Sequence, residues 1–84
     1  MKIIHDTNGA VCAYEIEVEV DDSTKEVKDV VFRGGCPGNH LGITALVRGM
    51  NASEAVKRLS GICCGSRQSS CPDQLAEALK KVLQ

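Results

Sequence analysis

Residues 11–20 alternate strictly in character, and this alternation requires a fold that contains a half-exposed β-strand. One set of positions is apolar or cysteine, namely Cys12, Tyr14, Ile16, Val18 and Val20. The intervening set consists of Ala13, Glu15, Glu17 and Glu19. Successive side chains of a strand point to opposite faces, so the pattern predicts one face in the core and one acidic face in solvent.

Turn signals on either side of this segment predict two more strands. Asn8-Gly9 suits a turn with positive φ, which would let Ile3-Ile4 pair with the segment that follows. After a turn at residues 21–24, Val27–Arg33 returns as another strand, which we expect to be antiparallel. The N-terminal third is therefore expected to form a small antiparallel sheet of about three strands.

The rest of the chain carries the start, stop and periodicity signals of three helices. The first spans residues 37–48. Asn51, with Glu54 three residues later, predicts the N-cap and capping box of the second helix, and Gly61 is its expected C-terminal cap. The third helix opens at Pro72.

Each helix is expected to bury one apolar stripe. The stripes are Ile43, Leu46, Val47 and Met50 in the first helix, Ala52, Ala55, Val56 and Leu59 in the second, and Leu75, Leu79, Val82 and Leu83 in the third. A small antiparallel sheet with three helices packed on one face is an α+β fold. At this length we expect residues 1–84 to form a single domain.

The charge and hydropathy patterns exclude several kinds of partner. Ten Lys and Arg against eleven Asp and Glu give no field of a single sign, and the chain has one Tyr, one Phe and no Trp for base stacking. Nucleic acid is therefore not an expected partner. No apolar run approaches the ~20 residues that cross a bilayer, and residues 1–6 lack the hydrophobic stretch of a signal peptide. We expect a cytoplasmic protein without a membrane partner.

Five cysteines are the obvious supplement to a small hydrophobic core. A domain of this size usually needs a disulfide, a metal ion or a partner chain in addition to its core, so a homo-oligomer is also a reasonable expectation. In a reducing cytosol, cysteines are more often metal ligands or redox groups than disulfides, and an odd number disfavours a fully paired framework.

Cys36 and Cys71 occupy equivalent local settings. Each precedes a proline that suits the first position of a helix, which places the thiol at or near the N-cap. Unpaired backbone N–H groups and the positive end of the helix dipole stabilise a thiolate there. Metal binding and nucleophilic chemistry both require a thiolate, so these two cysteines are the first candidates for a site.

The other cysteines complete a hypothesis of one tetrahedral site. Strand alternation turns Cys12 toward the helices, although a buried core cysteine would show the same pattern. Cys63 and Cys64 are adjacent in a loop, so only one of them is expected to join Cys71 in a site. Cys64 is favoured because Gly65 follows it, with Cys63 as its substitute. The predicted metal ligands are therefore Cys12, Cys36, Cys64 and Cys71, most simply holding Zn²⁺.

The histidines give weaker signals. His40 lies in the first turn of its helix, four residues after Cys36, where it could face the site, but we expect it to be exposed to solvent. His5 lies near a turn and has no partner visible in the sequence. Cys36 with His40 does not make a hydrolase dyad, because no third, orienting residue can be named. We therefore assign no catalytic residue.

Three segments resemble the TSCPD-domain family, in particular its small stand-alone members with four characteristic cysteines. They are residues 32–39, 59–65 and 70–76, with Ser70 in place of the threonine that gives the family its name. The resemblance covers nearly the whole chain. Carried over by position, the characteristic cysteines are Cys12, Cys36, Cys71 and one of the vicinal pair, with Cys64 preferred.

The same domain is found appended to cobalamin-dependent ribonucleotide reductases. The resemblance therefore implies an accessory role beside a ribonucleoside-diphosphate reductase, as a metal-bound tail, a thiol relay or a docking module. It does not imply the reductase activity itself, because 84 residues cannot build the large barrel that such an enzyme needs.

A more distant resemblance is to iron–sulfur cluster assembly scaffolds. It rests on residues 27–36 and on Cys71 ahead of residues 75–79. Those scaffolds combine a small antiparallel sheet with helices, and they bind zinc or a nascent cluster through three cysteines. In order along the chain, these three positions match Cys12, Cys36 and Cys71. The chain lacks their Gly-Asp after the first cysteine and has Ser70 where they carry histidine. The resemblance implies an iron–sulfur cluster as a second possible cofactor and a cluster-assembly protein as a partner.

Three functions follow from the sequence. The first is a small metal-binding protein of structural or scaffold-like role, with thiolates near helix N-termini. The second is an accessory domain of nucleotide reduction. The third is a thiol-redox protein in which Cys64 and Cys71 cycle between dithiol and disulfide. None of the three makes the chain an enzyme by itself.

Overall fold

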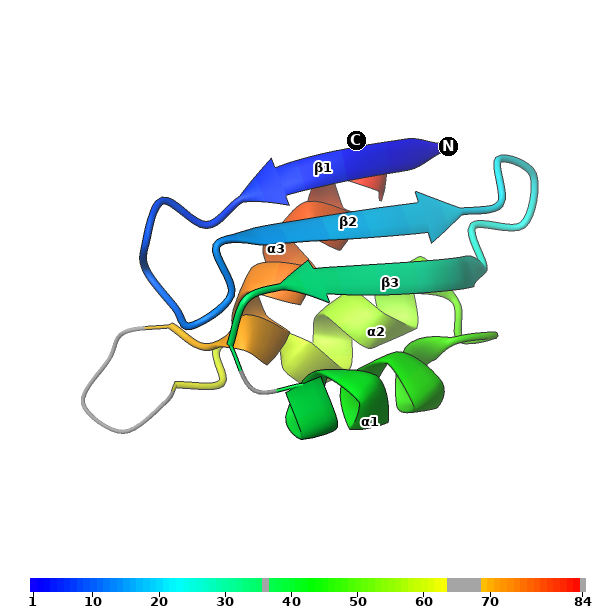
Figure 1. Ribbon diagram of the computed structural model, residues 1–84. Coiled ribbons are helices and arrows are strands. Elements are labelled where there is room, and N and C mark those ends of the chain that lie inside the picture. The colour runs from blue at the N-terminus through cyan, green and yellow to red at the C-terminus, as the bar shows by residue number, and fades with distance from the viewer. Residues whose placement is uncertain (36, 64–68, 84) are drawn as a thin grey trace.

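A three-stranded sheet lies over three helices in the computed structural model, which describes residues 1–35, 37–63 and 69–83 (Figure 1). The elements, in chain order, are β1 (Lys2–Asp6), β2 (Glu15–Val20), β3 (Val27–Arg33), α1 (Pro37–Val47), α2 (Ala52–Leu59) and α3 (Cys71–Leu83). The predicted α+β fold is confirmed, with the expected three strands and three helices. No helix within these ranges is long and apolar enough to cross a membrane.

The sheet is an antiparallel meander in the order β1-β2-β3. Ile16 in the central strand lies opposite His5 of β1 and Phe32 of β3, so these three side chains form one row across the face that the helices cover. The other face carries the predicted acidic residues, where Glu15 and Glu17 pair with Arg33 at 3.4 and 3.3 Å. From residue 15 onward the alternation therefore specifies the strand as predicted.

The N-terminal part of the predicted strand forms a loop instead, and the prediction of inward-facing Cys12 and Tyr14 is wrong. Both residues are exposed, whereas Val11 and Ala13 are buried. Thr7 is the physical reason. Its N–H donates to the Tyr14 carbonyl at 3.2 Å, one pair beyond Asp6 and Glu15, and its hydroxyl donates to the Ala13 carbonyl at 2.7 Å, so the ladder ends there and the chain closes around buried Thr7.

α3 is the central helix of the second layer. It packs on β1, β2 and α2, while α1 packs on β3. The buried residues of α3 are Leu75, Ala76, Ala78, Leu79 and Val82. Leu83, which was expected in this stripe, is 38% exposed because it lies at the helix end, beyond the sheet contact.

α2 follows its prediction closely. Asn51 is its N-cap, and the side chain accepts a hydrogen bond from the Ser53 N–H. Glu54 bonds to Arg58 at 2.9 Å rather than closing the expected capping box. The predicted stripe packs into the core, with Ala52 and Ala55 fully buried and the remaining two residues partly buried. Local capping and periodicity were sufficient to place this helix.

α1 is rotated relative to its predicted stripe. Leu46 is 76% exposed, whereas His40 is only 7% exposed, so both expectations are wrong. The inward residues His40, Ile43 and Val47 have the spacing i, i+3, i+7 of one helix face. Because α1 covers only β3 at the edge of the sheet, its contact stripe is narrow and leaves Leu46 outside.

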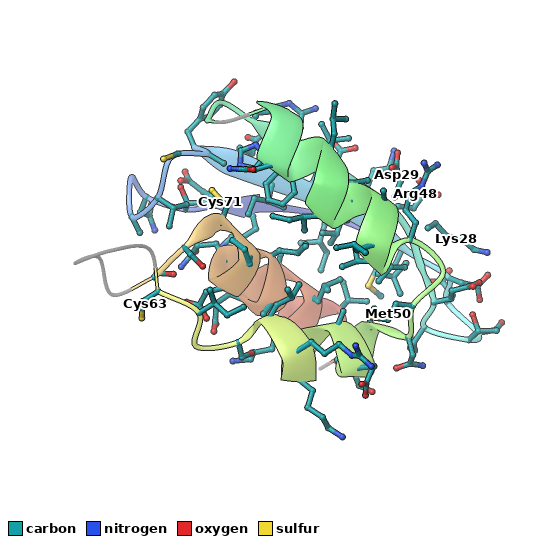
Figure 2. The ribbon with its side chains drawn as sticks, turned by 90° about the horizontal axis from the view of Figure 1, so that it is seen from below. Lys28, Asp29, Arg48, Met50, Cys63 and Cys71 are labelled. Carbon is teal, nitrogen blue, oxygen red and sulfur yellow. The ribbon has the colours of Figure 1, made fainter. Side chains whose placement is uncertain are left out.

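Polar side chains within α1 and directly after it bind the outer edge of β3. The Thr44 hydroxyl donates to the Val30 carbonyl at 3.3 Å, and Arg48 Nε donates to the Lys28 carbonyl at 3.4 Å. Figure 2 shows Arg48 extending from the end of α1 beside Lys28 and Asp29. The edge of β3 that faces away from β2 is therefore attached to the helix that covers it.

Candidate functional site

A pocket of about 300 Å³ lies between the first turns of α1 and α3. It is lined by Cys12, Asn39, His40, Ile43, Ser70, Cys71 and Pro72. The β1–β2 connection, the β3–α1 connection and the start of α3 meet at this end of the molecule, on the left of Figure 1. Two cysteines from distant parts of the sequence therefore border one cavity, together with a histidine.

Cys71 is the first residue of α3, one position earlier than predicted. Ser70 is the N-cap, because its hydroxyl accepts the Asp73 N–H at 3.1 Å and its carbonyl accepts the Gln74 N–H at 2.8 Å. Pro72 is thus the second helical residue. The partly buried Cys71 thiol lies in the first turn, where the helix dipole and unpaired N–H groups favour a negative charge.

Cys12 reaches the pocket from the β1–β2 loop and lies against the backbone of Gly35. A Cβ placed on Gly35 would be 3.1 Å from the Cys12 Cβ and 2.6 Å from the His40 Cε1. Gly35 also has a φ of +83°, which L side chains rarely adopt. Glycine here lets the chain that leads to Cys36 pass directly against both side chains.

His40, which from the sequence could face the site but was expected in solvent, is buried and borders this pocket. Its ring stacks on Phe32 with centroids 4.2 Å apart and an interplanar angle of 17°. Burial lowers the pKa of His40, so the neutral imidazole is favoured. Within the described part of the chain, no hydrogen-bond partner reaches either ring nitrogen. The signal that could have found it is its spacing with Ile43 and Val47.

His40 also borders a second cavity. This cavity has a volume of about 420 Å³ and lies between β3 and α1, with Phe32, Leu41 and Thr44 among its lining residues. Its lining includes no cysteine from the described ranges.

A hydrogen-bond network fixes the chain before Cys71. The Asp73 carboxylate accepts the Ser69 hydroxyl at 2.6 Å and the Gly61 N–H at 2.7 Å, and these two bonds lower the pKa of Asp73, with Ser69 as the larger cause. The Ser70 hydroxyl donates to the Ile62 carbonyl at 2.6 Å. Gly61, the predicted cap of α2, has a φ of +83°. The end of α2 is thereby tied to the first turn of α3.

Cys63 lies outside the pocket. Its side chain is exposed, and its thiol donates to the Gly61 carbonyl at 3.6 Å. Figure 2 shows Cys63 at the edge of the molecule and Cys71 at the start of α3. Cys36 and Cys64, the remaining predicted ligands, lie outside the described residues.

The described residues alone do not form a complete metal site. Among residues 1–35, 37–63 and 69–83, no group of three or more His, Cys, Asp or Glu side chains is arranged to hold a metal ion. What these ranges bring together is two of the four predicted cysteines, Cys12 and Cys71, with His40 at the same pocket.

His5, the other buried histidine, is fully hydrogen-bonded. Its Nδ1 lies 2.7 Å from Lys81 Nζ and its Nε2 lies 2.8 Å from Gln74 Oε1. Because the ammonium group can only donate, Nδ1 accepts and Nε2 carries the proton given to Gln74. His5 thus connects β1 to α3. Its position two residues after the partly buried Ile3, on the same strand face, was the available signal.

Comparison with known proteins gives one match. The family model of the TSCPD domain matches residues 2–83. A search of curated proteins and a search of solved structures each found no match. Since the matched range contains all six helices and strands of the structure, the chain belongs to the TSCPD domain family.

Proposed function

We propose that this protein binds a metal ion through cysteine thiolates in the pocket between the first turns of α1 and α3. The observation that carries the proposal is that Cys12 and Cys71, from opposite ends of the sequence, line the same pocket. Cys36 and Cys64 are the further ligands that the sequence predicts. Zn²⁺ is the first candidate, and an iron–sulfur cluster is the second.

The residues at the pocket fit such a group chemically. Thiolates are the preferred protein ligands of structural zinc and of iron–sulfur clusters. Several thiolates in one place repel one another, and two helix N-termini supply positive potential that offsets this repulsion. The close approach of Gly35 to Cys12 brings the β3–α1 connection to the same point. The donor set and its electrostatic surroundings therefore favour a cation.

A bound ion would serve a structural purpose in this chain. It would connect the β1–β2 loop to α3 across the pocket that separates them. A structural Zn²⁺ contributes on the order of 10 kcal/mol in apparent binding free energy, which is comparable with the whole stability of a small domain. A core without Trp and with one Phe gains most from such a connection.

Metal analysis of protein purified without oxygen tests the proposal. We expect about one zinc or iron atom per chain in the wild type, lost in Cys71→Ser and in Cys12→Ser. Cys63→Ser is the matched control and should retain the metal, because its exposed side chain lies outside the pocket. A wild-type protein that stays metal-free after reconstitution with Zn²⁺ or with iron and sulfide would refute the proposal.

The same preparation separates the two competing functions. A metal-free protein in which a Cys64–Cys71 disulfide forms and is reduced reversibly would favour thiol-redox chemistry. Retention of a ribonucleotide reductase subunit by metal-free protein would favour the accessory role, and retention of a cluster-assembly protein by iron-loaded protein would favour the scaffold role.

A further inference from the structure

We propose that the exposed side of α1, made of Leu41, Gly42, Ala45 and Leu46, docks on the same side of α1 in a second copy of this chain. The two helices run antiparallel about a twofold axis. The proposal does not depend on metal binding and assigns the chain a homodimer interface. α1 is placed for this contact, because it packs on β3 at one edge of the helical layer and its opposite side is exposed (Figure 1).

The exposed side of α1 is apolar, unlike that of the other two helices. Leu41 is 71% exposed and Leu46 is 76% exposed, and none of residues 37–47 is charged. By contrast, α2 and α3 each have an acidic residue in the first turn and basic residues in the last. A helix that is apolar all round is normally covered on every side. The chain itself covers only one side of α1.

The glycines of α1 are not required by packing within the chain. A Cβ built on Gly38 or on Gly42 would meet no other part of the described chain within 4 Å, and neither residue has a positive φ. Glycine inside a helix destabilises it relative to alanine. Gly42, in the middle of α1, therefore lowers the stability of the single chain with no benefit to it. A benefit arises when another backbone approaches, since helices with small contact residues pack closely.

The order of residues on this side suits a second copy of the chain. Outward from the midpoint of residues 41–46, Ala45 and Leu46 follow in one direction, and Gly42 and Leu41 follow in the other. A twofold contact must be self-complementary in this way. With the axis between residues 43 and 44, Gly42 lies level with Ala45 of the second copy. The small residues lie between the two leucines around the helix, so the backbones meet there and leucines flank the contact.

The area of this side predicts a reversible dimer. An 11-residue helix is about 16 Å long. On the Leu41 side, the apolar surface continues through the cavity of about 420 Å³ to Val31, which is 38% exposed. A long-lived interface buries about 800 Å² on each partner, and a single helix pair with this margin covers less. We therefore expect a Kd of about 10–100 μM. Because the contact is uncharged, the Kd should vary little with salt.

Sedimentation equilibrium of the full chain in a reducing buffer, from about 1 μM to 1 mM, tests the proposal. Leu46→Glu should weaken the dimer at least about tenfold, because it places two carboxylates in an apolar contact. Ile4→Glu is the matched control and should leave the Kd unchanged, since Ile4 is 59% exposed but lies on β1. A wild type that stays monomeric at the highest concentration would overturn the proposal. A dimer that Leu46→Glu leaves intact would overturn it in favour of another surface.

Gly42→Leu separates close helix packing from a merely apolar contact. It should raise the Tm in dilute solution, where the chain is monomeric, because leucine favours a helix more than glycine does. It should also weaken the dimer at least about tenfold, because the larger side chain holds the two backbones apart. Stronger association of this variant would overturn the close approach at Gly42.

Mixing two variants tests the twofold axis. Leu41→Glu and Leu41→Lys should each be monomeric alone, because like charges of the two copies repel each other. An equimolar mixture should form dimers, since the two copies of residue 41 lie on the same side of an antiparallel pair. A mixture that stays monomeric would overturn the twofold arrangement.

Discussion

The imidazole of His40 stacks on the ring of Phe32 at a centroid distance of 4.2 Å. This contact joins the first turn of α1 to the end of β3, and it agrees with the observed rotation of the helix about its own axis. The rotation brings His40, Ile43 and Val47 against the sheet and leaves Leu46 in solvent. The stacked histidine and the apolar residues Ile43 and Val47 thus lie on the side of α1 that packs on the sheet, and His40 and Ile43 also border the candidate site.

Replacing Phe32 with Ala should destabilise the protein. The side chain is partly buried against the core, so we expect a loss of about 2 kcal/mol, below the range for fully buried phenylalanines. Urea denaturation followed by circular dichroism measures it. Tyr14→Ala, at the other aromatic residue, is the control and should change stability by less than about 1 kcal/mol because Tyr14 is exposed. Equal losses in the two variants would contradict the role given to the stacked pair.

The rotation of α1 can be tested with two adjacent residues. Val47→Ala should cost about 2 kcal/mol, because this buried side chain leaves a cavity against β3. Leu46→Ala should change the free energy of unfolding by less than about 0.5 kcal/mol, although it removes more carbon, because the side chain is exposed. The reverse order of effects would favour the stripe predicted from sequence.

Gly35→Ala should be more harmful than Gly9→Ala. Both glycines have positive φ, so each substitution incurs a backbone penalty of about 1–2 kcal/mol. Only at Gly35 would the new methyl group also collide with His40 and Cys12, whereas nothing lies within 4 Å of it at Gly9. The difference between the two losses in a denaturation experiment isolates the crowding. Similar losses of stability in the two variants would mean that His40 and Cys12 can move away from the new methyl group at no cost in free energy.

Asp73 should contribute to the dependence of stability on pH. Its pKa is lowered from 3.8 by the bonds from Ser69 and Gly61, so the folded state favours the carboxylate. A lowered pKa adds stability that is complete above the ordinary value of 3.8 and is lost as pH falls through the folded-state pKa. Asp73→Asn should therefore be less stable than the wild type at neutral pH, and its stability should fall less in acid.

Ser69→Ala is the companion variant for this prediction. The substitution removes the Ser69 hydrogen bond, which is the larger cause of the lowered pKa of Asp73. We expect this pKa to rise toward its ordinary value, and an NMR titration of the carboxyl carbon measures it. An unchanged pKa of Asp73 would show that the hydrogen bond from the Ser69 hydroxyl does not stabilise the carboxylate.

Removal of metal should lower the melting temperature. If the ion contributes several kcal/mol, excess chelator should reduce the Tm by more than about 10 °C, because each kcal/mol shifts the Tm of a domain this small by about 4–8 °C. Cys71→Ser lacks one of the proposed metal ligands, so it should bind no metal and should melt at the same temperature with and without chelator. A wild-type melt that is indifferent to chelator would argue against a structural ion.

Much of the fold could be predicted because its signals are local. The Asn51 cap depends on residues within one turn, and the strand Val27–Arg33 was placed at its observed bounds by turn chemistry and apolar pattern. The position of Cys71 at a helix start followed in the same way from its neighbours, within one residue.

The errors arose where a long-range contact decided the outcome. Cys12 was placed on the inner strand face, but the bonds of Thr7 turn that segment into a loop. His40 was expected in solvent, but it is 7% exposed and stacks on Phe32 of the neighbouring strand. The spacing of His40 with Ile43 and Val47 indicates a shared helix face, but the partner residue of neither contact can be read from spacing along the chain. The same holds for His5, whose partners lie in α3.

The attachment of α1 to β3 also limits how copies of the chain can associate. An open sheet edge offers unpaired backbone groups on which a neighbouring strand can add, and this is a common route to aggregation. Thr44 and Arg48 already occupy the Val30 and Lys28 carbonyls on the outer side of β3. Strand addition there would have to displace a helix, so continuous sheets between molecules would have to grow from β1.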